Sequence, residues 1–132
     1  MKTNQIIYWA TTGIIAAMML FSGISYLTNE ELKAAFVTMG FPAFFRVELG
    51  WAKILGSLVL IIPAFPPLLK QFAYFGFALT FVSATIAHIS MGDPASVIAA
   101  PVFFFGILAV SYVYSSKIKL NLAKRASSTV VS

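Results

Sequence analysis

The amino-acid sequence predicts an all-α membrane protein: a bundle of four transmembrane helices with a short interfacial helix between spans 1 and 2. The first reason is composition. Hydrophobic residues make up 60% of the 132 residues and charged residues only 10%, whereas soluble domains average about 45–50% and about 25%. A small soluble domain also buries a smaller share of its surface than a large one, so it could not hide this much apolar area.

Four apolar segments are the second reason. A helix rises about 1.5 Å per residue, so the first segment would extend about 33 Å and cross a hydrocarbon core of about 30 Å. Prolines close the second segment, and a tight turn containing Gly92, Asp93 and Pro94 separates the third from the fourth. The expected spans are residues 6–27, 47–65, 72–91 and 97–114.

A short amphipathic stretch follows the first span. Thr28 and Glu31 have the spacing of a capping box, so we expect Thr28 to be the N-cap of a helix. Gly40 is expected to end this helix. Its apolar residues share one face, which is typical of a helix that lies in the membrane interface. They are Leu32, Ala35, Phe36 and Met39.

The spans are expected to form one membrane domain, residues 1–116, followed by a mobile basic tail, residues 117–132. Lys2, Lys70 and the basic residues of the tail fall on one side of the predicted bundle. Because basic loops stay in the cytoplasm, we expect both termini to be cytoplasmic in a bacterial inner membrane. No small-residue cleavage site follows the first segment, so we expect it to be retained as a span.

Several function classes are excluded or disfavoured by residue content. The sequence has no cysteine, which excludes disulfides, thiol redox chemistry and thiolate metal sites within the chain. The net charge of +5 is not expected to bind nucleic acid, because the basic residues flank apolar segments. No nucleophile triad or phosphate-binding glycine loop is present, and one histidine specifies no metal. Whether the protein is an enzyme is left open.

Polar residues are nevertheless expected to meet in the outer half of the bundle. Charges inside an apolar helix are costly unless they are paired or face a polar cavity. With the predicted orientation, residues from the first, second and third spans reach one level, together with the turn after the third span. The expected ligand-binding residues are Glu48, Lys53, His88, Trp51, Tyr26 and Asp93, of which the first three are also candidate catalytic groups.

Structural roles compete with each of these functional ones. Arg46 and Lys53 are seven residues apart and share a helix face, whereas Glu48 lies well round from Lys53. Arg46 is expected to be an interfacial anchor, and Glu48 could complement the helix dipole. Lys53 could form an ion pair with Glu48 or Asp93. His88 could be a core histidine, and Asp93 a turn residue.

Short motifs occur along the chain in a recognisable order and spacing. They are Tyr8-Trp9 with Thr11 and Thr12, Ser22-Gly23, Met39-Gly40-Phe41-Pro42, Gly50-x-x-Lys53-x-x-Gly56, Ala87-His88 with Gly92-Asp93, and Ser111-Tyr112. Together they resemble the DoxX-like family of small four-helix integral membrane proteins, over residues 6–114. That group includes a subunit of a thiosulfate:quinone oxidoreductase. Animal relatives are similar to a receptor-assembly chaperone and a cargo receptor.

Two functions follow as hypotheses. The first is a membrane subunit that binds a quinone or another amphipathic small molecule at the polar site, in association with an oxidoreductase system. No other cofactor is evident. The alternative is a non-enzymatic assembly, chaperone or cargo-type protein that docks another membrane protein through the 30–39 helix. Besides the lipid bilayer, a second copy of the chain is a possible partner, through the small residues Ala52 and Gly56.

Overall fold

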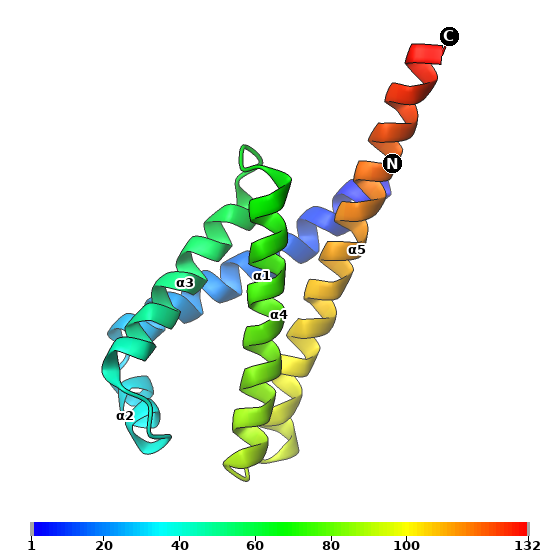
Figure 1. Cartoon of the computed structure of the whole chain (residues 1–132). Coiled ribbons are helices and arrows are strands. Elements are labelled where there is room, and N and C mark those ends of the chain that lie inside the picture. Colours follow the sequence, from blue (N-terminus) through cyan, green and yellow to red (C-terminus); the bar gives the residue numbers. More distant parts are fainter. Residues whose placement is uncertain (1, 132) are drawn as a thin grey trace. The chain divides into compact units, whose positions relative to one another are not determined.

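The computed structural model describes the backbone of residues 2–131 and the side chains of residues 2–128. Within that range every regular element is a helix (Figure 1), so the all-α prediction is confirmed. The five helices are α1 (Lys2–Thr28), α2 (Glu30–Thr38), α3 (Ala43–Ile61), α4 (Pro67–Ser90) and α5 (Ala95–Val131).

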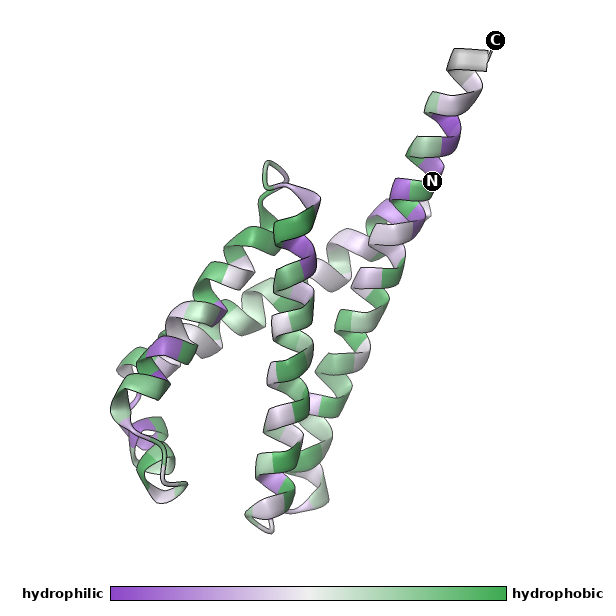
Figure 2. Cartoon of the chain, viewed as in Figure 1, coloured by the Kyte–Doolittle hydropathy of each residue, from purple (hydrophilic) through white to green (hydrophobic). Residues whose placement is uncertain are grey.

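Three of these helices are long and apolar enough to cross a membrane. They are α1, α4 and the Ala95–Ser128 part of α5, and Figure 2 shows hydrophobic residues along all three. The predicted second span corresponds to α3, which is not among these candidates. This helix carries Arg46, Glu48 and Lys53, and charged residues are costly within a hydrocarbon core. A four-span bundle with α2 in the interface therefore stays a prediction.

Each expected span differs at its ends from the corresponding helix, and two of these differences have clear reasons. Helix α3, the expected second span, ends just before the proline run, as expected, but it ends at Ile61 rather than at residue 65. The last proline of the run, Pro67, begins α4, because proline suits the first turn of a helix, where its missing N–H has no partner to lose. The C-terminal end of α5 lies beyond the apolar segment, because the helix continues through the basic residues that follow it. The domain boundary at residue 116 and the mobility of residues 117–132 remain predictions.

The predicted cap of the second helix was wrong by one residue. Thr28 belongs to α1, where its hydroxyl donates to the carbonyl of Ile24 at 2.9 Å. Asn29 takes an extended conformation and is the N-cap of α2. Its Oδ1 accepts the backbone N–H groups of Glu31 at 2.8 Å and Leu32 at 3.2 Å. The chain therefore turns after α1 with two of the four free N–H groups of α2 satisfied.

The chain divides into two compact units. One combines the start of α1, up to Gly13, with the chain from Thr80 onward, and the other is Ile14–Leu79. In the first unit, the hydroxyls of Thr12 and Ser111 lie 2.6 Å apart and are both fully buried. This hydrogen bond links α1 to α5 within the unit.

In the second unit, glycines set the distance between helices. A Cβ at Gly23 would lie 2.7 Å from the carbonyl oxygen of Gly50, so α1 and α3 are in backbone contact there. A Cβ at Gly56 would lie 2.7 Å from the Phe77 ring of α4. Small residues allow such close helix contact. Gly56 thus serves packing within the chain, and self-association through Ala52 and Gly56 stays a prediction.

Candidate functional site

The second unit holds a buried lysine. Lys53 projects from α3 toward α1 and is only 6% exposed. Its Nζ donates to the Ser22 hydroxyl at 2.9 Å and lies 3.6 Å from the centroid of the Tyr26 ring. Ser22 and Tyr26 are four residues apart, so they occupy neighbouring positions on one face of α1. We call Lys53, Ser22 and Tyr26 the lysine cluster.

Arg46 lies on the same face of α3, two turns before Lys53. Its side chain is buried, and its Nη1 donates to the backbone carbonyl of Tyr26. Because α1 ends at Thr28, the Tyr26 carbonyl is one of the last four, which have no partner within the helix. Arg46 therefore caps the end of α1. The side chain turns inward to a backbone acceptor, and its role as an interfacial anchor stays a prediction.

Four aromatic rings follow one another from the lysine cluster. The ring of Tyr26 contacts Phe36 of α2 edge-on, with centroids 5.1 Å apart. Phe36 lies 5.7 Å from Phe41, which stacks on Phe45 at 5.0 Å. These rings connect α1, α2 and α3. We call Tyr26, Phe36, Phe41 and Phe45 the aromatic row.

Two residues of the predicted site point elsewhere. Glu48 is exposed, and Trp51 is 53% exposed. At about 100° per residue, Trp51 lies on the opposite side of α3 from Lys53. The structure therefore does not bring Glu48 or Trp51 to the lysine cluster. Among the described residues of this unit, neither Lys53 nor Arg46 forms an ion pair with a carboxylate, so the possible Lys53–Glu48 ion pair is not formed. A Lys53–Asp93 ion pair would join the two units and stays a prediction.

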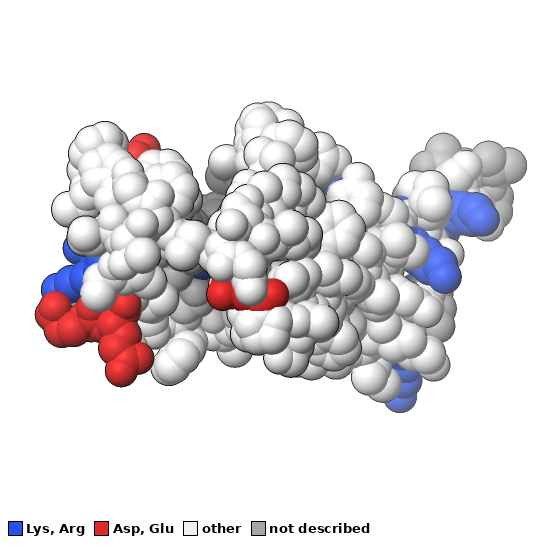
Figure 3. Space-filling view, turned by 90° about the horizontal axis from the view of Figure 1, so that it is seen from below, with Lys and Arg blue, Asp and Glu red and all other residues white. Residues whose placement is uncertain are grey.

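Acidic side chains in the second unit lie at the surface instead. Figure 3 shows one cluster of acidic side chains at the surface beside basic ones. Lys33 forms a surface ion pair there with Glu30, at 3.0 Å. Solvent screens such pairs, so this contact adds little stability.

The other unit holds His88 and Asp93. His88 lies in the last turn of α4, and Asp93 lies in the turn that leads to α5. The Nδ1 atom of His88 and the Oδ2 atom of Asp93 are 2.6 Å apart, and both side chains are half-buried. Asp93 is thus a turn residue that also orients an imidazole. Among the described residues, no group of three histidine or acidic side chains is placed to hold a metal ion.

The predicted site residues therefore fall into two groups. Tyr26 and Lys53 meet in one unit, while His88 and Asp93 meet in the other. The prediction that all four line one site stays a prediction. Sequence reasoning named Ser22 only within the Ser22-Gly23 motif and did not count it as a partner of Lys53. The contact of Arg46 with the Tyr26 carbonyl could not be predicted from residue types, because every residue has a backbone carbonyl.

A comparison with protein families matches the DoxX-like family over residues 10–112, well over half of the chain. The chain belongs to the DoxX-like family. The resemblance seen in the motifs is thereby confirmed, and with three apolar helices the chain is a DoxX-like membrane protein. No curated protein and no solved structure matches it.

The matched region of this DoxX-like protein contains both groups of polar residues. They differ in chemistry. The lysine cluster carries a buried cation that can donate hydrogen bonds to a ligand oxygen. The His88–Asp93 pair holds an imidazole by one nitrogen and leaves the other for a ligand.

Proposed function

We propose that this DoxX-like protein spans a bacterial inner membrane four times, with both termini in the cytoplasm, and binds an amphipathic small molecule at the lysine cluster. A quinone is the ligand that suits this site best. In this topology α3 is the remaining span, since its 19 residues would extend about 28 Å. Helix α2 then lies in the outer interface, and the basic end of α5 lies in the cytoplasm.

The observation that carries the proposal is the burial of Lys53 without a carboxylate partner among the described residues of its own unit. A buried ammonium is costly unless it is paired and hydrogen-bonded. Ser22 satisfies one of its three N–H donors, and the Tyr26 ring contributes a cation–π contact that is worth about 0.5–2 kcal/mol. Lys53 can therefore still donate a hydrogen bond to an electron-rich oxygen of a ligand.

The aromatic row favours a quinone over other oxygen-bearing heads. A quinone has carbonyl oxygens that accept hydrogen bonds and a flat ring that can stack. Tyr26 belongs both to the lysine cluster and to the aromatic row, so one ligand head can contact the ammonium and an aromatic face. Offset or edge-on ring contacts are worth about 0.5–1.5 kcal/mol each. The apolar tail of a quinone would remain in the bilayer.

Association with an oxidoreductase system is part of this proposal. The chain would hold the quinone head, and a partner enzyme would exchange electrons with it. Glu48 and Trp51 are exposed on other faces of α3, so they are available to such a partner rather than to the ligand. In this account neither is a ligand-binding residue.

The proposal is tested by quinone binding to the purified protein in lipid nanodiscs. Binding of a short-tailed ubiquinone is measured through the quenching of tryptophan fluorescence, since the protein has two tryptophans. Hydrogen bonds to charged groups contribute about 1.5–3 kcal/mol. Lys53→Met is therefore expected to raise the Kd by about 10- to 100-fold. Lys33→Met, which removes a surface lysine of α2, is the matched control and should leave the Kd unchanged. Equal affinities in both variants would reject the lysine cluster as the quinone site.

The alternative, an assembly or cargo-type partner protein, is favoured by one feature of α2. Its first turn presents the exposed carboxylates of Glu30 and Glu31, and Val37 is exposed near its end. Such a surface could contact another membrane protein. Glu30→Lys combined with Glu31→Lys should then release a partner that co-purifies in mild detergent. If quinone binding were absent and that partner were released, the alternative would replace the first proposal.

A further inference from the structure

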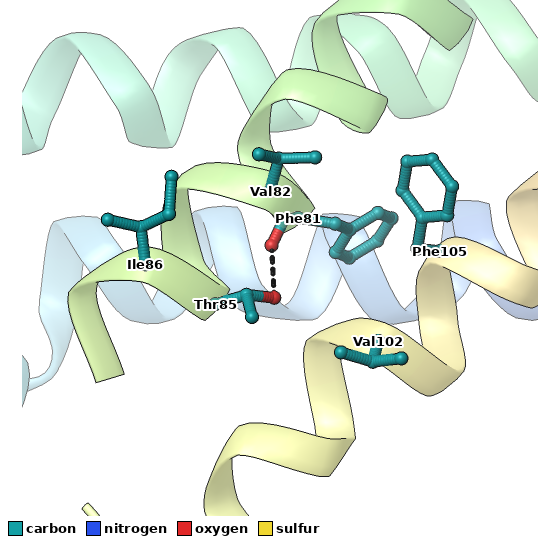
Figure 4. Close-up of a pocket in the computed structure, with 6 residues that line it drawn as sticks. All are labelled: Phe81, Val82, Thr85, Ile86, Val102 and Phe105. Carbon is teal, nitrogen blue, oxygen red and sulfur yellow. Dashed lines mark hydrogen bonds between the residues drawn. The ribbon is translucent and has the colours of Figure 1, made fainter. Parts of the chain in front are cut away.

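An apolar groove lies between α4 and α5, within one unit of the chain. Its volume is about 250 Å³. The close-up in Figure 4 shows side chains from both helices around it. The lining residues are Phe81, Val82, Thr85, Ile86, Val102 and Phe105.

The groove offers a ligand only hydrocarbon surface. Thr85 is the one polar residue of the lining, and its hydroxyl donates to the Phe81 carbonyl of its own helix at 2.8 Å (Figure 4). Val102 is 54% exposed and Ile86 is also exposed, so the groove opens at the surface. Because α4 and α5 are candidate membrane spans, that surface meets lipid. The part of a ligand that fills this groove is therefore a hydrocarbon chain.

A polar pair lies just beyond one end of the groove. His88 follows Thr85 by three residues, about 4.5 Å along the axis of α4. It also follows Phe81 by seven residues and so lies on the same face of the helix. The half-buried imidazole lies 2.6 Å from Asp93. The groove and the pair together match a molecule with an apolar chain and one polar end.

The geometry of the pair selects the chemistry of that polar end. Because Asp93 holds the Nδ1 atom of His88, Nε2 is the ring nitrogen left for a ligand. A hydroxyl group can both donate and accept a hydrogen bond, so it can bond to Nε2 whichever role that nitrogen takes. The negative charge of Asp93 disfavours an anionic head at this place, because like charges repel. Pockets for drug-sized molecules have volumes of about 300–1,000 Å³. The groove, at about 250 Å³, is smaller, so it has room for a single narrow hydrocarbon chain.

We propose that α4 and α5 bind an uncharged single-chain lipid whose hydroxyl head hydrogen-bonds to His88 and whose hydrocarbon chain fills the groove. Long-chain alcohols and monoacylglycerols belong to this class. The site uses none of the residues of the lysine cluster. It therefore stands whether or not the lysine cluster binds a quinone, and Lys53→Met should leave it unchanged.

Photolabelling of the full chain in nanodiscs tests the site. Three probes of equal length carry a diazirine in the middle of the chain: a long-chain alcohol, its methyl ether and the matching fatty acid. We expect the alcohol to label the 81–86 and 102–105 segments. Val102→Trp fills the groove and should lower that labelling at least tenfold. Val113→Trp changes a residue of α5 that is 47% exposed but does not line the groove, and it should have no effect.

The head is tested with the same probes. His88→Phe should make the alcohol label no better than the ether, since neither then has a ring nitrogen to bond to. Equal labelling of the unmodified protein by the fatty acid would overturn the assignment of a hydroxyl head. Labelling that is spread evenly over the apolar surface, or that Val102→Trp leaves unchanged, would overturn the assignment of the groove as the site of the hydrocarbon chain. Ile86→Trp provides a second filling variant if Val102→Trp does not fold.

Discussion

Substituting Gly23 by alanine tests the closest helix contact in the structure. The added Cβ would lie 2.7 Å from the Gly50 carbonyl oxygen and 2.9 Å from Cγ1 of Ile54. The first of these atoms belongs to the backbone of α3 and cannot rotate away. Helix α1 must therefore move from α3, which also loosens the contact between Ser22 and Lys53.

The expected cost follows from this geometry. Overpacking costs about 1–3 kcal/mol, and a rigid backbone contact places Gly23→Ala near the upper end. Gly13 is the matched control in the same helix, because a Cβ there would meet nothing within 4 Å. Gly13→Ala should gain up to about 1 kcal/mol from helix propensity. The free energy of unfolding of Gly50→Ala should lie between those of the other two variants, since its Cβ would meet the nearest atoms only at 3.1 Å.

The assay is reversible unfolding in mixed micelles, with the free energy of unfolding obtained from the helical signal as the SDS fraction rises. Gly23→Ala should be less stable than Gly13→Ala by up to about 3 kcal/mol, because the gain in helix propensity is common to both variants and only Gly23→Ala carries the overpacking cost. Similar free energies for the two variants would refute the close approach of α1 to α3.

Two further predictions concern a helix cap and the topology. Asn29→Ala should destabilise the chain by about 1 kcal/mol, while Thr28→Ala should change the free energy of unfolding much less; the opposite order in the same unfolding assay would restore Thr28 as the cap. The chain has no cysteine, so a single cysteine introduced by Ser127→Cys reports the side of the membrane on which the tail lies. An impermeant maleimide should label it only in permeabilised cells, and labelling of intact cells would contradict a cytoplasmic tail.

The helices could be predicted because their signals are local. Apolar length and proline positions indicated each segment, and the structure changed only the ends. The cap was misplaced because Thr28 and Asn29 are both good N-cap residues. Which of them ends α1 depends on whether the threonine hydroxyl bonds back to Ile24, as it does here.

The candidate site was partly predictable for the same reason. The seven-residue spacing placed Arg46 and Lys53 on one face of α3, and both are buried while Glu48 is exposed. What those side chains contact depends on how α1 packs on α3, which no local pattern specifies. Arg46 bonds to a backbone carbonyl, and every residue type offers one. Its partner could therefore not be read from the sequence.

The central claim is that Lys53 donates to the head of an amphipathic ligand, and an experimental density map tests it most directly. The protein would be prepared in nanodiscs with an excess of a short-tailed ubiquinone. We predict density for a flat head within hydrogen-bonding distance of Lys53 Nζ, against the Tyr26 ring. A map in which Nζ contacts only protein atoms, with the quinone bound elsewhere or absent, would contradict it.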